Sequence, residues 1–282
     1  MTIGTCLCGA LEYEFTAPFD QMLHCHCSMC RKHHGAAFAT FVSAPISAFH
    51  WRKGENIVRA YASSSEGKRF FCPICGSVAP TLLPEAGFAL CPAGNLLDDP
   101  GVRPAMHMFV GSKAPWHTIT DDVPQHAGYP PEFGGGLGIE RPVAAARPGV
   151  VAGSCLCGDV AFEAGTPFRM HSCHCSRCRR GRSAAYATNA FVKTDAFRWT
   201  RGERGIVDYK VPEARFFGVA FCARCGSDVP RASARGFFVI PAGCLDTDPG
   251  IRPQAHIFVG SKAPWDEITD AIPQYAEMSP PW

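Results

Sequence analysis

The stretch GTCLCGALEYEF at residues 4–15 recurs as GSCLCGDVAFEA at residues 153–164, and other stretches of the chain recur in the same order. They are HCHCSMCRK at 24–32 with SCHCSRCRR at 172–180, FFCPICGS at 70–77 with AFCARCGS at 220–227, and MFVGSKAPW at 108–116 with IFVGSKAPW at 257–265. A repeat of about 150 residues is too long for a solenoid unit and has the size of an autonomous domain. The sequence therefore indicates a tandem duplication.

A stretch rich in glycine and proline, without apolar periodicity, separates the two copies. This composition is typical of a linker. We expect one domain at residues 1–130, a linker at 131–148 and a second domain at 149–282. The two domains are expected to pack together as an intrachain pseudo-dimer with approximate two-fold symmetry, in place of a homodimer.

Short runs rich in β-branched and aromatic residues fill each copy, and Gly and Pro interrupt them. LEYEF, AAFATFV, NIVRAY and KRFFC are examples from the first copy, and VAFEA, GIVDYKV and GFFVIPAG are examples from the second. Such runs favour strands. We predict a mainly β protein of antiparallel strands, with helical turns only near 28–34, 176–182, 116–120 and 265–271.

The charge balance and the apolar pattern exclude several classes of protein. Lys plus Arg number 27 against 25 Asp plus Glu, and no long basic run occurs, which argues against nucleic-acid binding. No apolar stretch is long enough for a membrane span, and the start resembles no export signal. We expect a soluble cytoplasmic protein, where sixteen cysteines at close spacings indicate metal binding rather than disulfides.

Four cysteines of each copy are expected to form a closed metal site. In C-x-x-C-G, two intervening residues let a turn aim both sulfurs at one ion, and the glycine permits the positive φ of that turn. The C-x-C pairs end in Gly9 and Gly158, which allow the bend that brings both sulfurs to one side. The two predicted four-cysteine clusters are Cys6, Cys8, Cys72 and Cys75 in the first copy, and Cys155, Cys157, Cys222 and Cys225 in the second.

Three more cysteines of each copy are expected to form a second kind of site. The first trio is Cys25, Cys27 and Cys30, and the second trio is Cys173, Cys175 and Cys178. Three protein ligands with an open fourth position are typical of catalytic zinc. The alternative is that His26 or His174 completes the shell, although each lies between two ligating cysteines. Both trios are candidate catalytic sites.

A metal in such a trio would bind a substrate thiol and favour its thiolate, which can attack an aldehyde carbon. Basic residues follow each trio and are candidates to hold the carboxylates of a small thiol. They are Arg31 and Lys32 in the first copy and Arg179 and Arg180 in the second, with Lys113 and Lys262 as further candidates. His107 and His256 lie in apolar runs and are expected to be satisfied core histidines. Cys91 and Cys244 are expected to be buried apolar residues.

Taken together, several motifs resemble those of the glutathione-dependent formaldehyde-activating enzyme family, which includes centromere protein V. They are G-x-C-x-C-G, C-H-C-x-x-C-R/K and F-C-x-x-C-G-S, followed by AGNLLDDPG or AGCLDTDPG and by H-x-F-V-x-S-K-x-P-W. The resemblance implies a twisted two-sheet β fold built around zinc, shared with a zinc-carrying regulator of Rab GTPases. It maps a structural zinc onto each four-cysteine cluster and a second zinc onto each trio, up to two per domain and four per chain.

The resemblance also implies the activity of a carbon–sulfur lyase acting in reverse, joining glutathione and formaldehyde into S-(hydroxymethyl)glutathione. We therefore predict a zinc enzyme that activates glutathione or a similar thiol for addition to formaldehyde or another aldehyde. The alternative is a non-catalytic, zinc-stabilised module that binds a protein partner.

Overall fold

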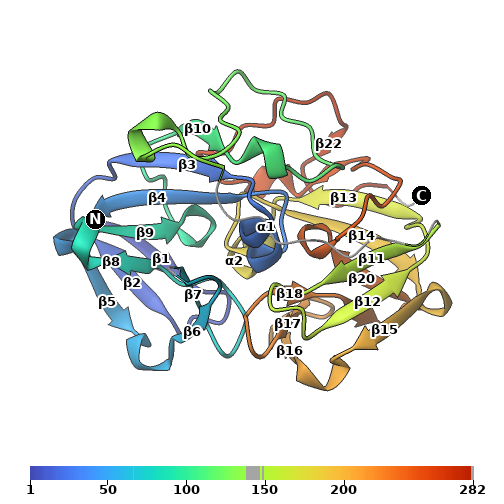
Figure 1. Cartoon of the computed structure of the whole chain (residues 1–282). Coiled ribbons are helices and arrows are strands. Elements are labelled where there is room, and N and C mark those ends of the chain that lie inside the picture. Colours follow the sequence, from blue (N-terminus) through green and yellow to red (C-terminus); the bar gives the residue numbers. More distant parts are fainter. Residues whose placement is uncertain (66, 138–146, 148, 281–282) are drawn as a thin grey trace.

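The computed structural model describes residues 1–65, 67–137, 147 and 149–280. It confirms a mainly β fold in two similar halves, which lie side by side with two short helices at their boundary (Figure 1). We call residues 1–137 the first half and residues 147–280 the second. Residues 138–146 and 148 of the expected linker lie outside the described residues.

The first half contains two sheets and a hairpin. One sheet has the strand order β1-β2-β5 and the other β10-β3-β4-β9-β8, in which only β10 and β3 are parallel, while β6 and β7 form the hairpin. The strands are β1 (Thr2–Thr5), β2 (Glu12–Phe15), β3 (Gln21–Cys25), β4 (Ala39–Pro45), β5 (Phe49–Lys53), β6 (Arg59–Ala62), β7 (Lys68–Phe71), β8 (Thr81–Leu83), β9 (Phe88–Pro92) and β10 (Pro104–Met108).

The second half repeats this plan with small extensions. Its sheets have the orders β11-β12-β15, β19-β20-β14-β13-β21-β22 and β16-β17-β18. The strands are β11 (Val151–Ser154), β12 (Ala161–Ala164), β13 (Arg169–Cys173), β14 (Ala187–Lys193), β15 (Phe197–Arg201), β16 (Ile206–Lys210), β17 (Gly218–Cys222), β18 (Asp228–Val229), β19 (Arg231–Ser233), β20 (Phe237–Pro241), β21 (His256–Ile257) and β22 (Gln274–Tyr275).

Two α-helices occur in the described residues, α1 (Ser28–His34) and α2 (Ser176–Arg182), both where the sequence predicts helical turns. The structure places no helix at 116–120 or 265–271, so that expectation is wrong. Short 3-10 helices end before these segments, and a single hydrogen-bonded turn at each tryptophan, from the His117 amide to Ala114 O and from the Asp266 amide to Ala263 O, is followed by irregular chain with β-branched residues. β-branched side chains lower the helix propensity of these segments.

The 3-10 helices of the described residues are mostly short connections between strands. The full set is η1 (Ile46–Ala48), η2 (Glu55–Ile57), η3 (Pro84–Ala86), η4 (Ala93–Asn95), η5 (Val110–Ser112), η6 (Pro131–Phe133), η7 (Thr194–Ala196), η8 (Glu203–Gly205), η9 (Ala242–Cys244) and η10 (Val259–Ser261). No helix among the described residues is long and apolar enough to cross a bilayer.

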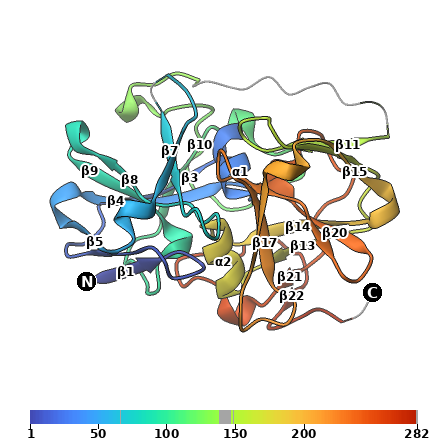
Figure 2. The same cartoon turned by 90° about the horizontal axis from the view of Figure 1, so that it is seen from below.

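The two halves share one apolar core and contact each other through equivalent elements. The largest buried cluster includes Phe15 and Trp116 of the first half together with Phe162 and Trp265 of the second. Helix α1 packs against η9 of the second half, and α2 packs against η4 of the first. Figure 2 shows α1 and α2 at the boundary between the halves. Burying this apolar surface stabilises the pairing.

Glycines make this close approach possible. Gly243 in η9 leaves no room for a side-chain carbon beside the backbone of Arg31 and Ala36, and Gly94 in η4 is equally tight against Ala184. Gly76 and Gly226, which follow the two C-x-x-C pairs, have φ values of 74° and 73°. Each of these two contacts a phenylalanine ring of the other half, Phe221 and Phe71 respectively. Each contact that a glycine of one half makes with the other half is therefore repeated by the equivalent glycine of the other half.

A buried ion pair between the halves has no equivalent in the repeat. Lys32 Nζ lies 2.5 Å from Asp246 Oδ1, and it donates to Ser154 O at 2.8 Å and to Ser154 Oγ at 2.9 Å. The side chains of Lys32 and Asp246 are 9% and 12% exposed. Breaking a buried pair by removing one partner costs more than the pair contributes, because the other charge stays buried.

We expect Lys32→Met to lower the free energy of unfolding by about 3 kcal/mol, because Asp246 loses its counterion. Arg180→Met is the matched control, since Arg180 is the repeat equivalent of Lys32 and its side chain donates one long hydrogen bond, of 3.5 Å, to Ser176 O. This control should change stability by less than about 0.5 kcal/mol. Urea unfolding followed by far-ultraviolet circular dichroism measures both values. Equal losses in the two variants would contradict the prediction.

Candidate metal centres

Each four-cysteine cluster brings its sulfurs together from two distant segments. In the first half, Cys6 and Cys8 follow β1, and Cys72 and Cys75 follow β7. The Cys6 and Cys8 sulfurs lie 3.5 Å apart, and the Cys8 and Cys72 sulfurs 3.7 Å apart. The second cluster repeats this geometry, with 3.4 Å between Cys155 and Cys157 and 3.7 Å between Cys157 and Cys222.

These distances fit a tetrahedral metal ion. With metal–sulfur bonds of about 2.3 Å, the edges of a sulfur tetrahedron measure about 3.8 Å. None of the sixteen cysteines, all of which lie in described residues, forms a disulfide. The donor set of both clusters therefore suits zinc, as the spacing predicts.

Hydrogen bonds within each half orient the sulfurs. Cys6 Sγ accepts from the Leu11 amide at 3.3 Å across the turn at Gly9, whose φ is 72°. The hydroxyl of Ser77 lies 3.3 Å from Cys75 Sγ and accepts from the Leu7 amide at 3.1 Å. The second half repeats all of these bonds with the residues Cys155, Val160, Cys225, Ser227 and Leu156. The two turns that carry the ligands thus support each other.

Each trio lies where a strand meets a helix. Cys25 ends β3, Cys27 caps the N-terminus of α1, and Cys30 lies in the first turn of that helix. The Cys30 amide donates to Cys27 Sγ at 3.2 Å. The second trio has the same arrangement on β13 and α2, with 3.4 Å between the Cys178 amide and Cys175 Sγ. In each trio the sulfurs lie within 4.8 Å of one another.

No fourth His, Cys, Asp or Glu of the described residues joins either trio. The side chain of His26, the candidate fourth ligand, turns away, and its Nε2 lies 2.9 Å from His107 Nδ1. His174 does the same in the second half, 2.8 Å from His256 Nδ1. Each trio therefore offers three sulfurs and lacks a fourth protein ligand among the described residues.

The two trios differ in burial and in charge. All three cysteines of the first trio are buried, whereas Cys175 of the second is half-buried. In each trio, hydrogen bonds with the other two cysteines lower the pKa of one thiol, Cys30 in the first trio and Cys175 in the second. The guanidinium of Arg69 lies beside Cys30, and sequence reasoning missed it. Comparing the two repeats position by position would have found it, because the second copy has Val219 there.

The four predicted basic residues differ in their burial and in their hydrogen-bond partners. Arg31 Nε donates to Ser112 O at 3.2 Å, and Lys32 is paired with Asp246 of the second half. Arg179 has a buried Nε without a hydrogen-bond partner, and burial lowers its pKa. Arg180 is half-buried at the surface of α2. Carboxylate binding by these four residues stays a prediction, and for Lys32 the ammonium already has a carboxylate partner.

The further candidates Lys113 and Lys262 donate to backbone carbonyls. Lys113 Nζ lies 2.9 Å from His117 O, and Lys262 Nζ lies 2.5 Å from Asp266 O. Cys91 and Cys244 are fully buried outside the clusters, and burial raises the pKa of each to about 12. Their interpretation as buried apolar residues is confirmed.

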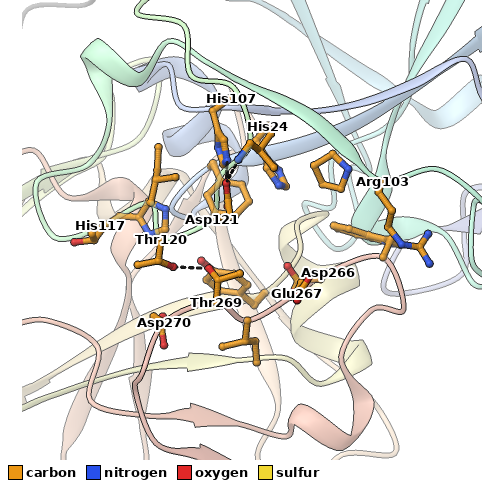
Figure 3. Close-up of a pocket in the computed structure, with 18 of the residues that line it drawn as sticks. His24, Arg103, His107, His117, Thr120, Asp121, Asp266, Glu267, Thr269 and Asp270 are labelled. Atoms are coloured by element: carbon orange, nitrogen blue, oxygen red, sulfur yellow. Dashed lines mark hydrogen bonds and ion pairs between the residues drawn. The ribbon is translucent and has the colours of Figure 1, made fainter.

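A cavity of about 230 Å³ is lined by residues of both halves (Figure 3). It is lined by equivalent His–Asp pairs, His107 with Asp121 at 2.9 Å and His256 with Asp270 at 3.0 Å, and the hydroxyls of Thr120 and Thr269 meet across it. These contacts confirm that His107 and His256 are satisfied histidines. His107 and His256 in turn hydrogen-bond to His26 and His174, and so hold the rings of these two histidines in place.

Comparison with known proteins finds a matching family model and similar proteins. A family model described as glutathione-dependent formaldehyde-activating enzyme matches residues 1–112 and 150–261. An uncharacterized lyase of Schizosaccharomyces pombe is 32% identical over 79 residues, which cover 26% of this chain and 52% of that protein. The chain thus spans about half the length of this curated relative. A crystal structure of a Rhodobacter sphaeroides protein, 26% identical, covers 36% of this chain and 97% of that one with a TM-score of 0.29.

Proposed function

The chain belongs to the glutathione-dependent formaldehyde-activating enzyme family, and from this we propose that it is a lyase-type enzyme that joins a thiol to an aldehyde. Glutathione and formaldehyde are the substrates that the family description suggests. The observation that carries the proposal is the pair of trios, each with three free sulfurs close together and no fourth protein ligand among the described residues.

We propose zinc in all four sites, two in each half. The four-cysteine clusters have the donor set and the sulfur spacing of closed structural sites. The trios have the donor set of a site with an exchangeable position. A zinc ion held by a trio would act as a Lewis acid that favours the thiolate form of a bound thiol.

The residues of the chain then orient the sulfurs. The helix caps at Cys27 and Cys175 fix two of the three sulfurs in each trio relative to the helix. In the reaction a bond forms between the thiol sulfur and the carbonyl carbon, and the π bond of the carbonyl breaks toward oxygen. The proton that the thiol loses ends on that oxygen, which gives a thiohemiacetal with no redox change.

Arg31, Arg179 and Arg180 are the proposed ligands of the substrate carboxylates. They lie on α1 or α2, next to or near the last cysteine of each trio, and guanidinium groups bind carboxylates in a bidentate manner. Lys32 was an equal candidate by sequence, but its buried pair with Asp246 supports a role in joining the halves.

We also propose that residues 1–130 and 149–282 are domains joined by a linker at 131–148 and paired as an intrachain pseudo-dimer. The packing of α1 on η9 and of α2 on η4, with the halves exchanged, supports this arrangement. An isologous contact of this kind is what a two-fold axis produces.

Elemental analysis and product detection test the proposed function together. The purified chain should contain four zinc ions, and glutathione mixed with ¹³C-formaldehyde should give S-(hydroxymethyl)glutathione faster with the protein than without it. Carbon-13 nuclear magnetic resonance measures the product. Four zinc ions without any acceleration, and without any binding of glutathione, would instead support a zinc-stabilised module that binds a protein partner.

A further inference from the structure

One position of the repeat changes the charge beside the trios. The residue before FFCPICGS is Arg69, and the residue before AFCARCGS is Val219. Arg69 lies in β7, and its Nη1 and Nη2 atoms lie 3.6 and 3.7 Å from Cys30 Sγ. The guanidinium thus donates to a sulfur of the first trio through both of its terminal nitrogens.

Among the described residues, Cys30 is the one hydrogen-bond acceptor of the Arg69 side chain. Its Nε is buried without a partner, and no carboxylate pairs with it among the described ion pairs. A buried cation is stable only near a negative charge. The thiolates of a metal-bound trio would provide that charge, whereas neutral thiols would not.

The second trio lacks this cation. Val219 is buried in an apolar cluster with Cys6 and Cys72 of the first half, and Phe217 packs against the cluster that contains Cys173 and Cys178. An arginine also follows each trio on its helix, but the two are placed differently: Arg31 Nε donates to Ser112 O at 3.2 Å, whereas Arg179 Nε is buried without a hydrogen-bond partner. Arg69 therefore adds a cation beside a sulfur of the first trio that has no counterpart at the equivalent position of the second copy, which is Val219.

We propose that Arg69 makes the two trios unequal, so that the first holds its metal more firmly and is the preferred site for an anionic thiol. This inference rests on the proposed function for its choice of ligand. A divalent ion with three thiolates carries a charge of −1, and the guanidinium brings the first site to zero. A thiolate ligand then brings the first site to −1 and the second to −2. Charge repulsion disfavours the second case. Arg69 acts as a specificity-determining residue rather than a catalytic one.

Two variants isolate the sites for the test. Cys175→Ser disables the second trio and leaves the first, and Cys27→Ser does the reverse. Both full chains are loaded with Co²⁺ and titrated with glutathione while the visible absorption of the cobalt is followed. Glutathione should bind the Cys175→Ser chain about 10- to 100-fold more tightly than the Cys27→Ser chain, because the positive charge of Arg69 lies near the trio that the Cys175→Ser chain retains. Adding Arg69→Val to the Cys175→Ser chain should remove this advantage, while Arg69→Lys should keep part of it.

Arg59→Val is the matched control, because Arg59 is an exposed arginine on the neighbouring strand β6. It should leave the glutathione affinity unchanged. The rate at which a chelator removes cobalt is a second readout, and the Cys175→Ser chain should retain its trio metal longer than the Cys27→Ser chain. Equal retention and equal glutathione affinity in these two chains, or no effect of Arg69→Val, would overturn the inference. If glutathione binds neither chain but Arg69 still slows metal loss, the unequal metal retention stands and the thiol function fails.

Discussion

Replacing Cys72 with serine is expected to leave the whole chain largely unfolded at room temperature. Cys72 is fully buried, and its sulfur lies 3.7 Å from that of Cys8 in the first four-cysteine cluster. A structural zinc site contributes on the order of 10 kcal/mol to folding. This is comparable with the entire stability of an ordinary domain, about 5–15 kcal/mol.

The loss should spread to the second half, because the cluster lies in the contact between the halves. Gly76, one turn from Cys72, contacts the ring of Phe221, and the Ser77 hydroxyl donates to Arg180 O at 2.8 Å. A disordered loop at 72–77 would remove both contacts. We therefore expect near-ultraviolet circular dichroism to be lost from aromatic residues of both halves.

Thermal unfolding and zinc content measure this effect, with Cys91→Ala as the control. Cys91 is a buried cysteine of the same half outside the clusters, so its truncation should lower stability by about 1–2 kcal/mol and leave the zinc content unchanged. A Cys72→Ser chain with all four zinc ions and a melting temperature within a few degrees of the parent would show that the cluster is not structural.

The sequence was sufficient for the features that depend on short spacing. The cysteines of C-x-x-C-G and of C-x-C lie within a few residues of one another, and each motif occurs in both copies. The grouping of the cysteines into the four-cysteine clusters and the trios agrees with the structure. The helices at 28–34 and 176–182 were also correct, since each begins at a cysteine that caps it. These features are local, and local geometry follows from residue type.

The features that depend on contacts between distant segments could not be predicted. The parallel pairing of β10 with β3 joins segments about 80 residues apart and sets His107 against His26. The pairing of Lys32 with Asp246 depends on how the halves pack. The local sequence around a basic residue that follows a cysteine motif is the same whether the side chain faces a substrate or a buried carboxylate. Only the tertiary structure separates these two cases.

Disabling both trios together, by Cys27→Ser and Cys175→Ser, is expected to abolish catalysis while the fold persists. Each substitution removes one of three thiolates from a site that has no fourth protein ligand among the described residues. We expect the catalysed rate, above the spontaneous reaction of glutathione with formaldehyde, to fall at least about 10³-fold, which is about 4 kcal/mol of transition-state stabilisation. Serine also caps helices well, so α1 and α2 should keep their N-terminal hydrogen bonds.

The single variants measure how much of the catalysed rate each half contributes. Cys244→Ala is the control for the loss of a buried thiol outside the trios. If Arg69 favours an anionic thiol in the first half, Cys27→Ser should lose most of the activity at low glutathione, and Cys175→Ser should lose little. Steady-state rates and melting temperatures measured on the same preparations separate lost chemistry from lost folding. A double variant that retains the parental rate would exclude the trios from catalysis, because each trio would have lost one of its three sulfurs.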